Sequence, residues 1–441
     1  MTPIDLLVLP RWLLPIEPAG PAREGWALAV HQGRIAAVLP RGEALASFQA
    51  AEVLSLDTHV VMPGLVNVHT HSAMTLLRGL ADDLPLMDWL QNHIWPAEAA
   101  HVGEAFCRDG VALACAEMIR GGQTCFNDMY FFPEATVAAA EAAGLRLSVG
   151  LIVLDFPTAY AQPGEYLAKG LALHDAVKRR PRVSTLFAPH APYSVSDAPL
   201  REIRKYADEL GIGIHMHVHE TAGEVAMAQQ QDGRRPWQRL AALELLGAGF
   251  LAVHMTQLTP GEIAEAARLG VSVAHCPHSN LKLASGLCPL AELLEAGVTV
   301  GLGTDGAASN NALDLWAEAR TAGLLAKGVG GDARAVDAAR LLRLLTLDGA
   351  RALGLDEQIG SLQAGKAADF IAVDLAAANS WPVYDPVSHL AYAVNSRQVS
   401  HSYVEGRCLL RDGQLQTLDE TALRAAAAGW AARIRPDGVH A

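Results

Sequence analysis

The sequence predicts an α/β fold, a (β/α)8 TIM barrel with a small composite β-sandwich domain formed by both termini. Short β-branched apolar runs alternate with alanine-rich helical segments through the middle of the chain, and eight such units can be counted. Both ends instead carry short strand candidates separated by proline and glycine. Strand–helix alternation is typical of a parallel sheet, and eight units favour a closed barrel. A doubly wound open sheet is the competing interpretation.

The elements of the barrel follow one another in chain order. The predicted strands are 60–68, 124–128, 145–154, 183–188, 213–217, 250–254, 271–275 and 298–304. The predicted helices between them include 104–119, 133–143, 165–179, 199–210 and 262–269. These elements place the barrel at residues 59–364.

The two ends of the chain share a different texture. Their strand candidates are 6–9, 26–31, 34–39, 368–373, 399–404 and 407–411, and a helix-like stretch follows at 420–432. Neither end alone has enough strands for a stable sheet, but together they can form one. We therefore expect residues 1–58 and 365–441 to build the sandwich, with the terminal helix attached to the second segment.

Composition excludes several classes of protein. The 441 residues are 51% hydrophobic and 18% charged, and such a length buries a core without metal or disulfide, so a metal site would indicate chemistry. The formal net charge is −13 without a cluster of Lys and Arg, which argues against a nucleic-acid partner. The six cysteines form no C-x-x-C pair, and neither a signal peptide nor a membrane span of about 20 apolar residues is present. The sequence therefore predicts a soluble, cytoplasmic protein without a membrane partner.

Histidines gather at the ends of two predicted strands. His69 and His71 are two residues apart and share one side of a strand end, since side chains alternate along a strand. A second cluster, 215–220, reads His-Met-His-Val-His-Glu and places three imidazoles on one face. Not all three can bind one ion, so at least one is expected to be structural.

Two further side chains stand at strand ends, His254 and Asp305. Either alone is more often a hydrogen-bonded cap. Together with the histidine clusters they occupy the carboxyl ends of strands 1, 5, 6 and 8, the face on which barrel enzymes carry their chemistry. Three imidazoles and one carboxylate, with a position left for water, suit a catalytic zinc.

One motif is misleading. Residues 301–306 fit the dinucleotide pattern G-x-G-x-x-G, but that pattern normally opens the first βαβ unit of its domain. Here it ends the strand series, and Asp305 within it would repel a pyrophosphate. The cytidine-deaminase signature H-x-E…P-C-x-x-C is absent, as is a P-loop.

Five longer motifs carry a resemblance to a known family. They are Pro63–His71 (PGLVNVHTH), Ala188–Tyr193 (APHAPY), His217–Thr221 (HVHET), Ser279–Gly286 (SNLKLASG) and Gly303–Asn311 (GTDGAASNN). Over essentially the whole chain the sequence resembles the amidohydrolase superfamily, in the branch of the 5-methylthioadenosine/S-adenosylhomocysteine deaminases and the triazine chlorohydrolases. The resemblance implies the same barrel and composite sandwich.

The resemblance also implies a single divalent ion, most often zinc, held by His69, His71, His217 and Asp305. No lysine stands where two-metal relatives carry a bridging carboxylated residue. The identity of the metal stays open, because this donor set also accepts Fe²⁺ or Mn²⁺.

Roles for the remaining site residues follow from the same resemblance. Glu220 would be the acid/base that delivers a proton to a ring nitrogen, His254 would orient the attacking water, and Asp305 would take its proton. Glu98 and His190 match positions that contact the nucleoside, with Glu220 and Asp305 also facing the substrate.

The implied reaction is hydrolytic deamination of an adenine nucleoside. Glu220 favours deamination over dechlorination, because an amine needs a proton in order to leave and chloride does not. The family's arginine for a homocysteine tail has no counterpart, since Arg146 stands too early and the run 151–156 is apolar. We therefore expect 5′-methylthioadenosine to be preferred over S-adenosylhomocysteine, with adenosine as a further candidate.

Two alternatives stay open. The first is a related hydrolase acting on guanine, a pterin or an s-triazine, with the same metal site. The second is a non-catalytic metal-binding scaffold, which would lack a ligand or the acid, and none is missing. The expected partner is a small-molecule nucleoside, and the sequence leaves a homo-oligomer open. The loop bearing Arg78, Asp82 and Asp83 is either a lid or, as we favour, a solvated turn.

Overall fold

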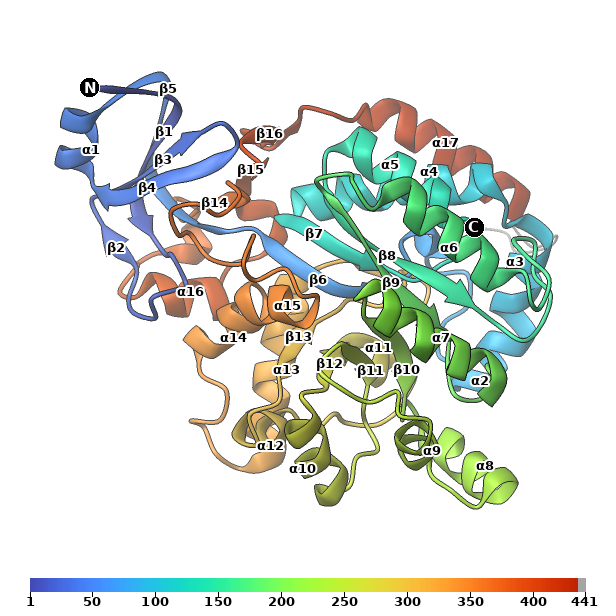
Figure 1. Cartoon of the computed structure of the whole chain (residues 1–441). Helices are drawn as coiled ribbons and strands as arrows, with labels where there is room; N and C mark the ends of the chain where they lie inside the picture. Colours follow the sequence, from blue (N-terminus) through green and yellow to red (C-terminus); the bar gives the residue numbers. More distant parts are fainter. Residues whose placement is uncertain (435–441) are drawn as a thin grey trace. The chain divides into compact units, whose positions relative to one another are not determined.

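The computed structural model describes residues 1–434, and its central feature is a parallel eight-stranded sheet (Figure 1). The strands are β6 (Leu65–Thr70), β7 (Gln123–Asp128), β8 (Arg146–Val153), β9 (Val183–Pro189), β10 (Ile214–Val218), β11 (Phe250–His254), β12 (Ser272–His275) and β13 (Val300–Leu302). They neighbour one another in chain order, which excludes the doubly wound alternative. The backbone N–H groups of Thr304 and Asp305, just after β13, each donate to the carbonyl of His69 in β6 at 3.1 Å. These bonds join the last strand to the first, and the predicted barrel is confirmed.

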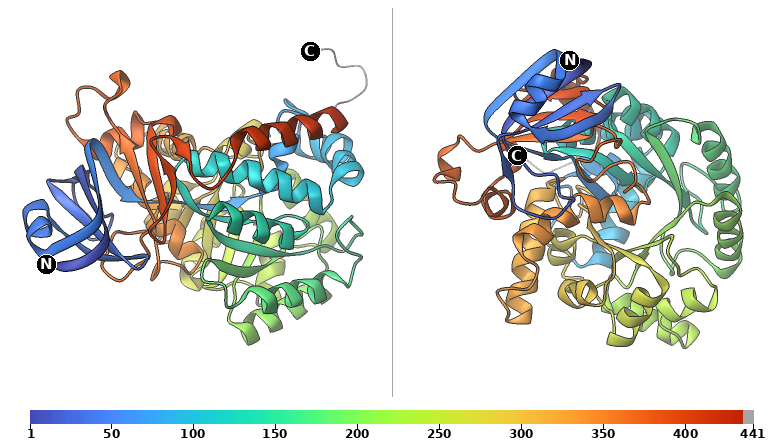
Figure 2. Two further views of the ribbon diagram at one scale, coloured as in Figure 1. Left: turned by 90° about the horizontal axis from the view of Figure 1, so that it is seen from above. Right: turned by 60° about the vertical axis from the view of Figure 1, so that its left-hand side comes forward.

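Helices follow the strands. They are α4 (Glu104–Arg120), α5 (Pro133–Ala143), α6 (Tyr166–Val177), α7 (Asp197–Leu210), α8 (Ala222–Asp232), α9 (Pro236–Ala242), α10 (Pro260–Leu269), α11 (Pro277–Lys282) and α12 (Leu290–Glu295). Figure 1 shows α5, α6 and α7 over the outer side of β8 and β9. Helix α7 buries Leu200, Ile203 and Ala207, an i, i+3, i+7 stripe, and ends at Gly211 in the left-handed region (φ 65°). The right view of Figure 2 shows the helices α5 to α9 curving round the strands.

The remaining helical elements lie outside this series. Between β6 and α4 are η1 (Ser72–Leu77), α2 (Leu86–Trp89), the π-helical turn η2 (Leu90–Ile94) and α3 (Trp95–His101). After β13 come α13 (Leu315–Gly330), α14 (Ala338–Leu344), α15 (Leu347–Ala352), η3 (Ala378–Ser380), α16 (Pro386–Tyr392), η4 (Ser396–Gln398) and α17 (Glu420–Ile434). The short α1 (Arg41–Ser47) lies near the N-terminus. None of the helices within 1–434 is long and apolar enough to cross a bilayer.

The second sheet combines both ends of the chain. Its strands are β1 (Thr2–Leu13), β2 (Arg23–Glu24), β3 (Trp26–His31), β4 (Arg34–Pro40), β5 (Phe48–Pro63), β14 (Phe370–Asp374), β15 (Val399–Val404), β16 (Arg407–Arg411) and β17 (Gln414–Leu415). Strand β5 is the joint, because it pairs in parallel with β1 and antiparallel with β14. The composite sheet expected from the two termini is therefore present.

This sheet folds over on itself. Ile35 in β4 and Tyr403 in β15 belong to one buried core, although four strands separate theirs in the sheet order. Phe370 stacks on Tyr403 with ring centroids 4.5 Å apart. The backbone N–H of Ala368, just before β14, donates to the carbonyl of Gly33, just before the edge strand β4, at 2.9 Å. Strands from both termini thus share one apolar interior.

The predicted strand 60–68 is two strands. β5 ends at Pro63 and β6 begins at Leu65, with Gly64 between the two sheets. A Cβ at Gly64 would lie 2.1 Å from Oγ1 of Thr124, so only glycine fits here. The apolar run is continuous in sequence because the last four residues of β5 and all of β6 are buried.

The chain divides into two compact units, and each unit is built from stretches that are far apart in the sequence. One unit comprises Met1–Asn67, Glu117–Cys125 and Asp314–Thr417, and the other Val68–Ala116, Phe126–Leu313 and the chain from Leu418 onward. The sequence places helix α17 with the sandwich segment, but it belongs to the second unit. Trp430 packs against Phe106 of α4, with ring centroids 5.2 Å apart, and its indole N–H donates to Asp109 at 2.9 Å.

Candidate metal-dependent active site

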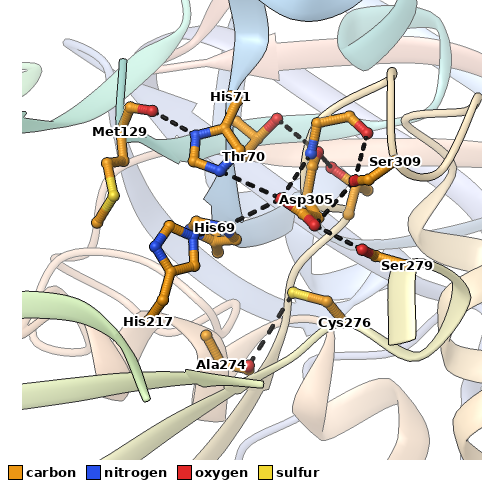
Figure 3. Close-up of polar contacts among 12 residues, drawn as sticks. His69, Thr70, His71, Met129, His217, Ala274, Cys276, Ser279, Asp305 and Ser309 are labelled. Atoms are coloured by element: carbon orange, nitrogen blue, oxygen red, sulfur yellow. Dashed lines mark hydrogen bonds and ion pairs between the residues drawn. The ribbon is translucent and has the colours of Figure 1, made fainter. Parts of the chain in front are cut away.

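Four side chains predicted as metal ligands meet at the carboxyl ends of the barrel strands. They are His69, His71, His217 and Asp305, and their donor atoms all lie within 4.8 Å of one another (Figure 3). His69 is the last residue but one of β6 and His71 lies just beyond the strand, His217 lies in β10, and Asp305 follows β13. Parallel strands of a barrel bring their ends to one face, which is why residues so distant in sequence converge.

The spacing of these donors fits a single ion. Asp305 Oδ1 lies 3.3 Å from Nε2 of His69 and 3.3 Å from Nε2 of His71, and the Nε2 atoms of His69 and His217 are also 3.3 Å apart. Two ligands about 2.05 Å from a tetrahedral zinc lie roughly 3.3 Å apart. The cluster therefore has the donor chemistry and the separations of a four-ligand metal site.

The other nitrogen of each imidazole is already engaged. Nδ1 of His71 donates to the carbonyl of Met129, and Nδ1 of His217 donates to the carbonyl of His190 at 2.8 Å. Nδ1 of His69 pairs with Nε2 of His215 at 2.9 Å. Such outer contacts fix ring orientation and direct Nε2 toward the shared point.

Charge in the cluster also suits a cation. Burial lowers the pKa of His69 to about 4 and that of His217 well below its usual value, so both imidazoles are neutral. Burial alone would raise the pKa of Asp305, but the bond from His69 and the neighbouring His71 hold it well below its usual range. Neutral imidazoles and an ionised carboxylate are the forms that bind a metal ion.

Asp305 is held by its second oxygen. Oδ2 accepts the hydroxyls of Ser279 at 2.6 Å and Ser309 at 2.8 Å, while Oδ1 accepts the N–H of Gly306 at 2.8 Å and faces the histidines (Figure 3). Both serines lie in motifs quoted from the sequence, but their contact with Asp305 could not be read there.

Two further predicted residues lie beside the cluster. His254 ends β11, and its Nε2 is 3.8 Å from Oε2 of Glu220, which follows β10. His254 Nδ1 donates to Oδ1 of Asn280 at 2.8 Å, which leaves Nε2 as an acceptor. Burial and the nearby charge of Asp305 raise the pKa of Glu220 to about 8. At neutral pH Glu220 therefore holds a proton.

Backbone conformation marks the same strand ends. His219, His254 and Asp305 all have positive φ angles, of 54°, 73° and 57°. Such angles are uncommon outside glycine and concentrate at functional sites. They turn each chain sharply after its strand, so that the side chains face the cluster or, for His219, away from it.

A cavity of about 730 Å³ opens above this cluster. Seven of its lining residues are ionisable and predicted from the sequence: His71, Glu98, His190, His217, Glu220, His254 and Asp305. The remaining wall is mostly apolar and aromatic, and includes Trp89, Trp95, Leu154 and Phe156. Such a mixture of apolar wall and few polar groups is typical of small-molecule sites.

The two predicted nucleoside contacts line the cavity on different elements. Glu98 in α3 accepts the hydroxyl of Tyr130 at 2.6 Å, and burial raises the pKa of Glu98 to about 7. His190, just after β9, pairs through Nδ1 with Ser194 Oγ at 3.0 Å. No sequence pattern points to Tyr130, because its partner Glu98 stands 32 residues earlier.

The histidine trio of residues 215–219 divides into three roles. His217 faces the cluster, and His215 lies behind His69 and contacts Asn127 (Nδ1–Nδ2 3.3 Å). His219 turns away, and its Nε2 accepts the backbone N–H of Trp237 at 3.2 Å. The expectation that at least one of the three is structural agrees with these contacts.

The loop after β6 is more than a solvated turn. Asp82 pairs with Lys282 of α11 at 2.5 Å, and Lys282 also donates to Oδ1 of Asn311 at 2.6 Å. Arg78 donates to the carbonyl of Asn311 at 2.5 Å. The loop is thus tied to the segments after β12 and β13, because its charges find partners that are distant in sequence.

A closed parallel barrel with a three-histidine, one-aspartate cluster and a buried carboxylic acid beneath one cavity defines a metal-dependent hydrolase of the barrel class. The chain belongs to the amidohydrolase family, whose sequence profile matches residues 60–409.

Individual relatives cover nearly the whole chain. A 5-methylthioadenosine/S-adenosylhomocysteine deaminase of Teredinibacter turnerae is 47% identical over 434 residues, 98% of each chain. The crystal structure of an adenosine deaminase from Xanthomonas campestris with bound zinc is 50% identical, with a TM-score of 0.97 over 98% of this chain and 99% of that one. An atrazine chlorohydrolase from Arthrobacter aurescens, complexed with zinc, shares the fold with a TM-score of 0.90 over 96% and 99% at 22% identity.

Proposed function

We propose that this protein is a zinc-dependent aminohydrolase that converts 5′-methylthioadenosine and water to 5′-methylthioinosine and ammonia. The observation that carries the proposal is the buried Glu220 carboxyl 3.8 Å from His254, at the edge of a His₃Asp cluster and inside the cavity. The relatives named as deaminases, at 47% and 50% identity over 98% of the chain, support the same reaction.

The cluster His69, His71, His217 and Asp305 would hold the metal ion. When bound, such an ion acts as a Lewis acid and makes a nucleophile from water at neutral pH. Zinc is the metal favoured by these donors and by their roughly tetrahedral separations. The zinc bound to the Xanthomonas campestris deaminase agrees with this choice.

Glu220 and His254 would handle the protons. Glu220 is positioned to give its proton to the ring nitrogen next to C6, which makes that carbon electrophilic and lets the attacking water add. The acceptor Nε2 of His254 would orient that water, while Asp305 Oδ1 would take its proton and pass it to the C6 amino group. The C6–N bond then breaks and ammonia leaves. Proton delivery by a positioned group is worth about 100- to 10,000-fold in rate.

Glu98 and His190 would bind the ribose. Because Tyr130 donates to only one oxygen of Glu98, the other is left for a sugar hydroxyl. His190 is neutral, since burial lowers its pKa to about 3, and pairs through Nδ1 with Ser194. Its other ring nitrogen is left for the sugar.

The cavity favours an uncharged 5′ substituent. Among the described residues that line it there is no Lys or Arg, although the carboxylate of a homocysteine tail would need one. Arg146 lies at the beginning of β8 and bonds the carbonyl of Pro181 at 3.3 Å, so it does not line the cavity. Phe156 and Trp95, with ring centroids 6.4 Å apart, offer an apolar wall for a methylthio group. We therefore propose that 5′-methylthioadenosine is preferred over S-adenosylhomocysteine.

The test is release of ammonia, and for a chlorotriazine release of chloride, by zinc-loaded protein. The substrates are 5′-methylthioadenosine, S-adenosylhomocysteine, adenosine, guanine and a chlorotriazine, with Glu220→Gln as the control. We expect the highest kcat/KM for the methylthio-nucleoside and its loss in the variant. Turnover of guanine or the triazine alone would instead support a related ring hydrolase and contradict the proposal. No turnover of any ring despite bound zinc would support a non-catalytic scaffold.

A further inference from the structure

A second buried carboxylate lies behind the turn that carries Glu220. Glu224 Oε2 accepts the backbone N–H of Glu220 at 2.7 Å, and its Oε1 accepts that of His219 at 3.2 Å. Glu224 is only 7% exposed, and it is absent from the lining of the large cavity. Its carboxylate therefore serves the backbone of this turn and not the substrate.

The contact differs from an ordinary helix cap. In a capping box, the glutamate at the third helical position accepts the N–H of the N-cap residue itself. Helix α10 follows that rule, because Glu262 Oε2 accepts the N–H of Thr259 at 2.8 Å. Helix α8 has the same Thr-x-x-Glu spacing, and Thr221 accepts the N–H of Glu224 at 3.1 Å. The Glu224 carboxylate, however, bonds the two residues that precede the N-cap.

The other side of the same turn is also fixed. Thr256 Oγ1 donates to the carbonyl of Glu220 at 2.7 Å, and the Thr256 N–H donates to the carbonyl of His219 at 3.0 Å. Thr256 stands two residues after His254. The backbone of Glu220 is thus held at its N–H by Glu224 and at its carbonyl by the segment that carries His254.

We propose that Glu224 is a positioning residue for the hydrolytic reaction, holding the Glu220 carboxyl beside His254 through the amide groups of His219 and Glu220. The inference rests on the proposed function in that Glu220 is taken as the proton donor. Without the carboxylate, two buried N–H groups lose their acceptor and the turn can shift. A displacement of about 1 Å at a reacting group costs about 100-fold in rate.

The first test compares two equally buried helix-cap glutamates. We expect Glu224→Ala to lower kcat by about 100-fold while KM and bound zinc stay close to wild type. Glu262→Ala is the control, because it also removes a 7%-exposed capping carboxylate but leaves the Glu220 amide bonded. It additionally breaks the ion pair with Arg235 (2.7 Å), so it is the more severe change outside the turn. Its kcat should stay near that of the wild type even if its melting temperature falls. Glu224→Gln keeps one acceptor oxygen, so it should recover part of the lost kcat and carries the test if the alanine variant does not fold.

A double-mutant cycle separates positioning from general stabilisation. If Glu224 acts through Glu220, Glu224→Ala adds no further loss of kcat in a Glu220→Gln background. Amide hydrogen exchange at Glu220 should accelerate in Glu224→Ala and not in Glu262→Ala. Equal losses of kcat in both backgrounds, or a kcat near wild type in Glu224→Ala, would overturn the inference.

The cycle does not depend on which ring is hydrolysed. It is run with whichever substrate of the panel the wild-type protein turns over, and the exchange measurement needs no substrate. Failure of the purine nucleosides with turnover of another ring would overturn the proposed function, while the cycle and the exchange rates would still decide the role of Glu224.

Discussion

Glu220 and His254, which follow and end adjacent strands of the barrel, face each other with Oε2 and Nε2 3.8 Å apart. The gap is too long for a direct hydrogen bond, so the carboxyl and the imidazole are both available to a third group. Since Asn280 accepts the Nδ1 hydrogen of His254, the pair presents one donor and one acceptor to that group. This arrangement leads to the first two predictions.

Replacement of Glu220 by Gln is expected to lower kcat by about 100- to 10,000-fold, because the amide cannot deliver a proton to the ring. Bound zinc should remain, since Glu220 is not one of the four clustered residues proposed to hold the metal. Steady-state rates and metal analysis of the same preparation check both points. If the variant kept the wild-type kcat, Glu220 would not be the residue that delivers the proton.

The pH profile of kcat/KM should fall on its alkaline side. The pKa of Glu220 is raised to about 8, so the acid form needed for proton delivery prevails below that pH and is lost above it. The value of kcat/KM should therefore decrease as the pH rises through about 8. The residual activity of Glu220→Gln should not show this alkaline decrease. A profile that stays level to pH 10 would argue against a carboxylic acid as donor.

Removal of the metal should abolish turnover but leave a folded protein, because the barrel and the sandwich have apolar cores of their own. Zinc at about 1,000 times its dissociation constant would add about 4 kcal/mol to the free energy of unfolding. Thermal melting of chelated and zinc-loaded protein measures this gain. The gain in stability on adding zinc should be absent in His217→Ala and present in Glu220→Gln.

Phe156→Ala tests the apolar end of the cavity. Loss of this ring is expected to lower kcat/KM for 5′-methylthioadenosine about tenfold, through lost apolar contact, and to change adenosine much less. Tyr384 is exposed and belongs to the first compact unit. Its replacement, Tyr384→Ala, is the control and should change kcat/KM for neither substrate. Equal losses for both nucleosides would place the 5′ substituent elsewhere.

Glu98 should make stability depend on pH. Burial raises the pKa of Glu98 from 4.5 to about 7, so between these values the folded protein binds the proton more tightly than the unfolded chain. The free energy of unfolding should therefore fall as the pH rises from 4.5 to 7, by about 3 kcal/mol at most from this group. Urea unfolding of metal-free wild type and Glu98→Gln at pH 5 and 7.5 compares the slopes. The variant should show the smaller decrease.

The fold and the proposed ligands could be predicted because the relevant signals are local. His69, His71 and His217 each follow a short apolar run, and histidines two residues apart face the same side of a strand. A parallel barrel brings the ends of such strands to one face, so these histidines lie close together. The limits of strand β5 and the packing of helix α17 depend on contacts that are not local. What decides their position is a distant partner, β1 and β14 for the strand and Phe106 for the helix.

The contacts that hold the site residues in place could not be predicted from the sequence either. Tyr130 bonds Glu98, and Ser279 bonds Asp305, but no spacing rule connects these pairs. The reach of the Glu224 carboxylate past its own N-cap is hidden as well, because the sequence shows only an ordinary Thr-x-x-Glu cap. Such contacts depend on turn geometry, which the positive φ of His219 sets.

The bonds that close the barrel have a consequence for assembly of the protein. The backbone N–H groups of Thr304 and Asp305 donate to the carbonyl of His69. His69 and Asp305, which belong to the four-residue cluster, thus also join the first strand to the last. A chain in which this seam is open cannot bring Asp305 to His69. The four-residue cluster therefore exists only in a closed barrel, so the first and last strands must pair before a metal ion can be held by all four side chains.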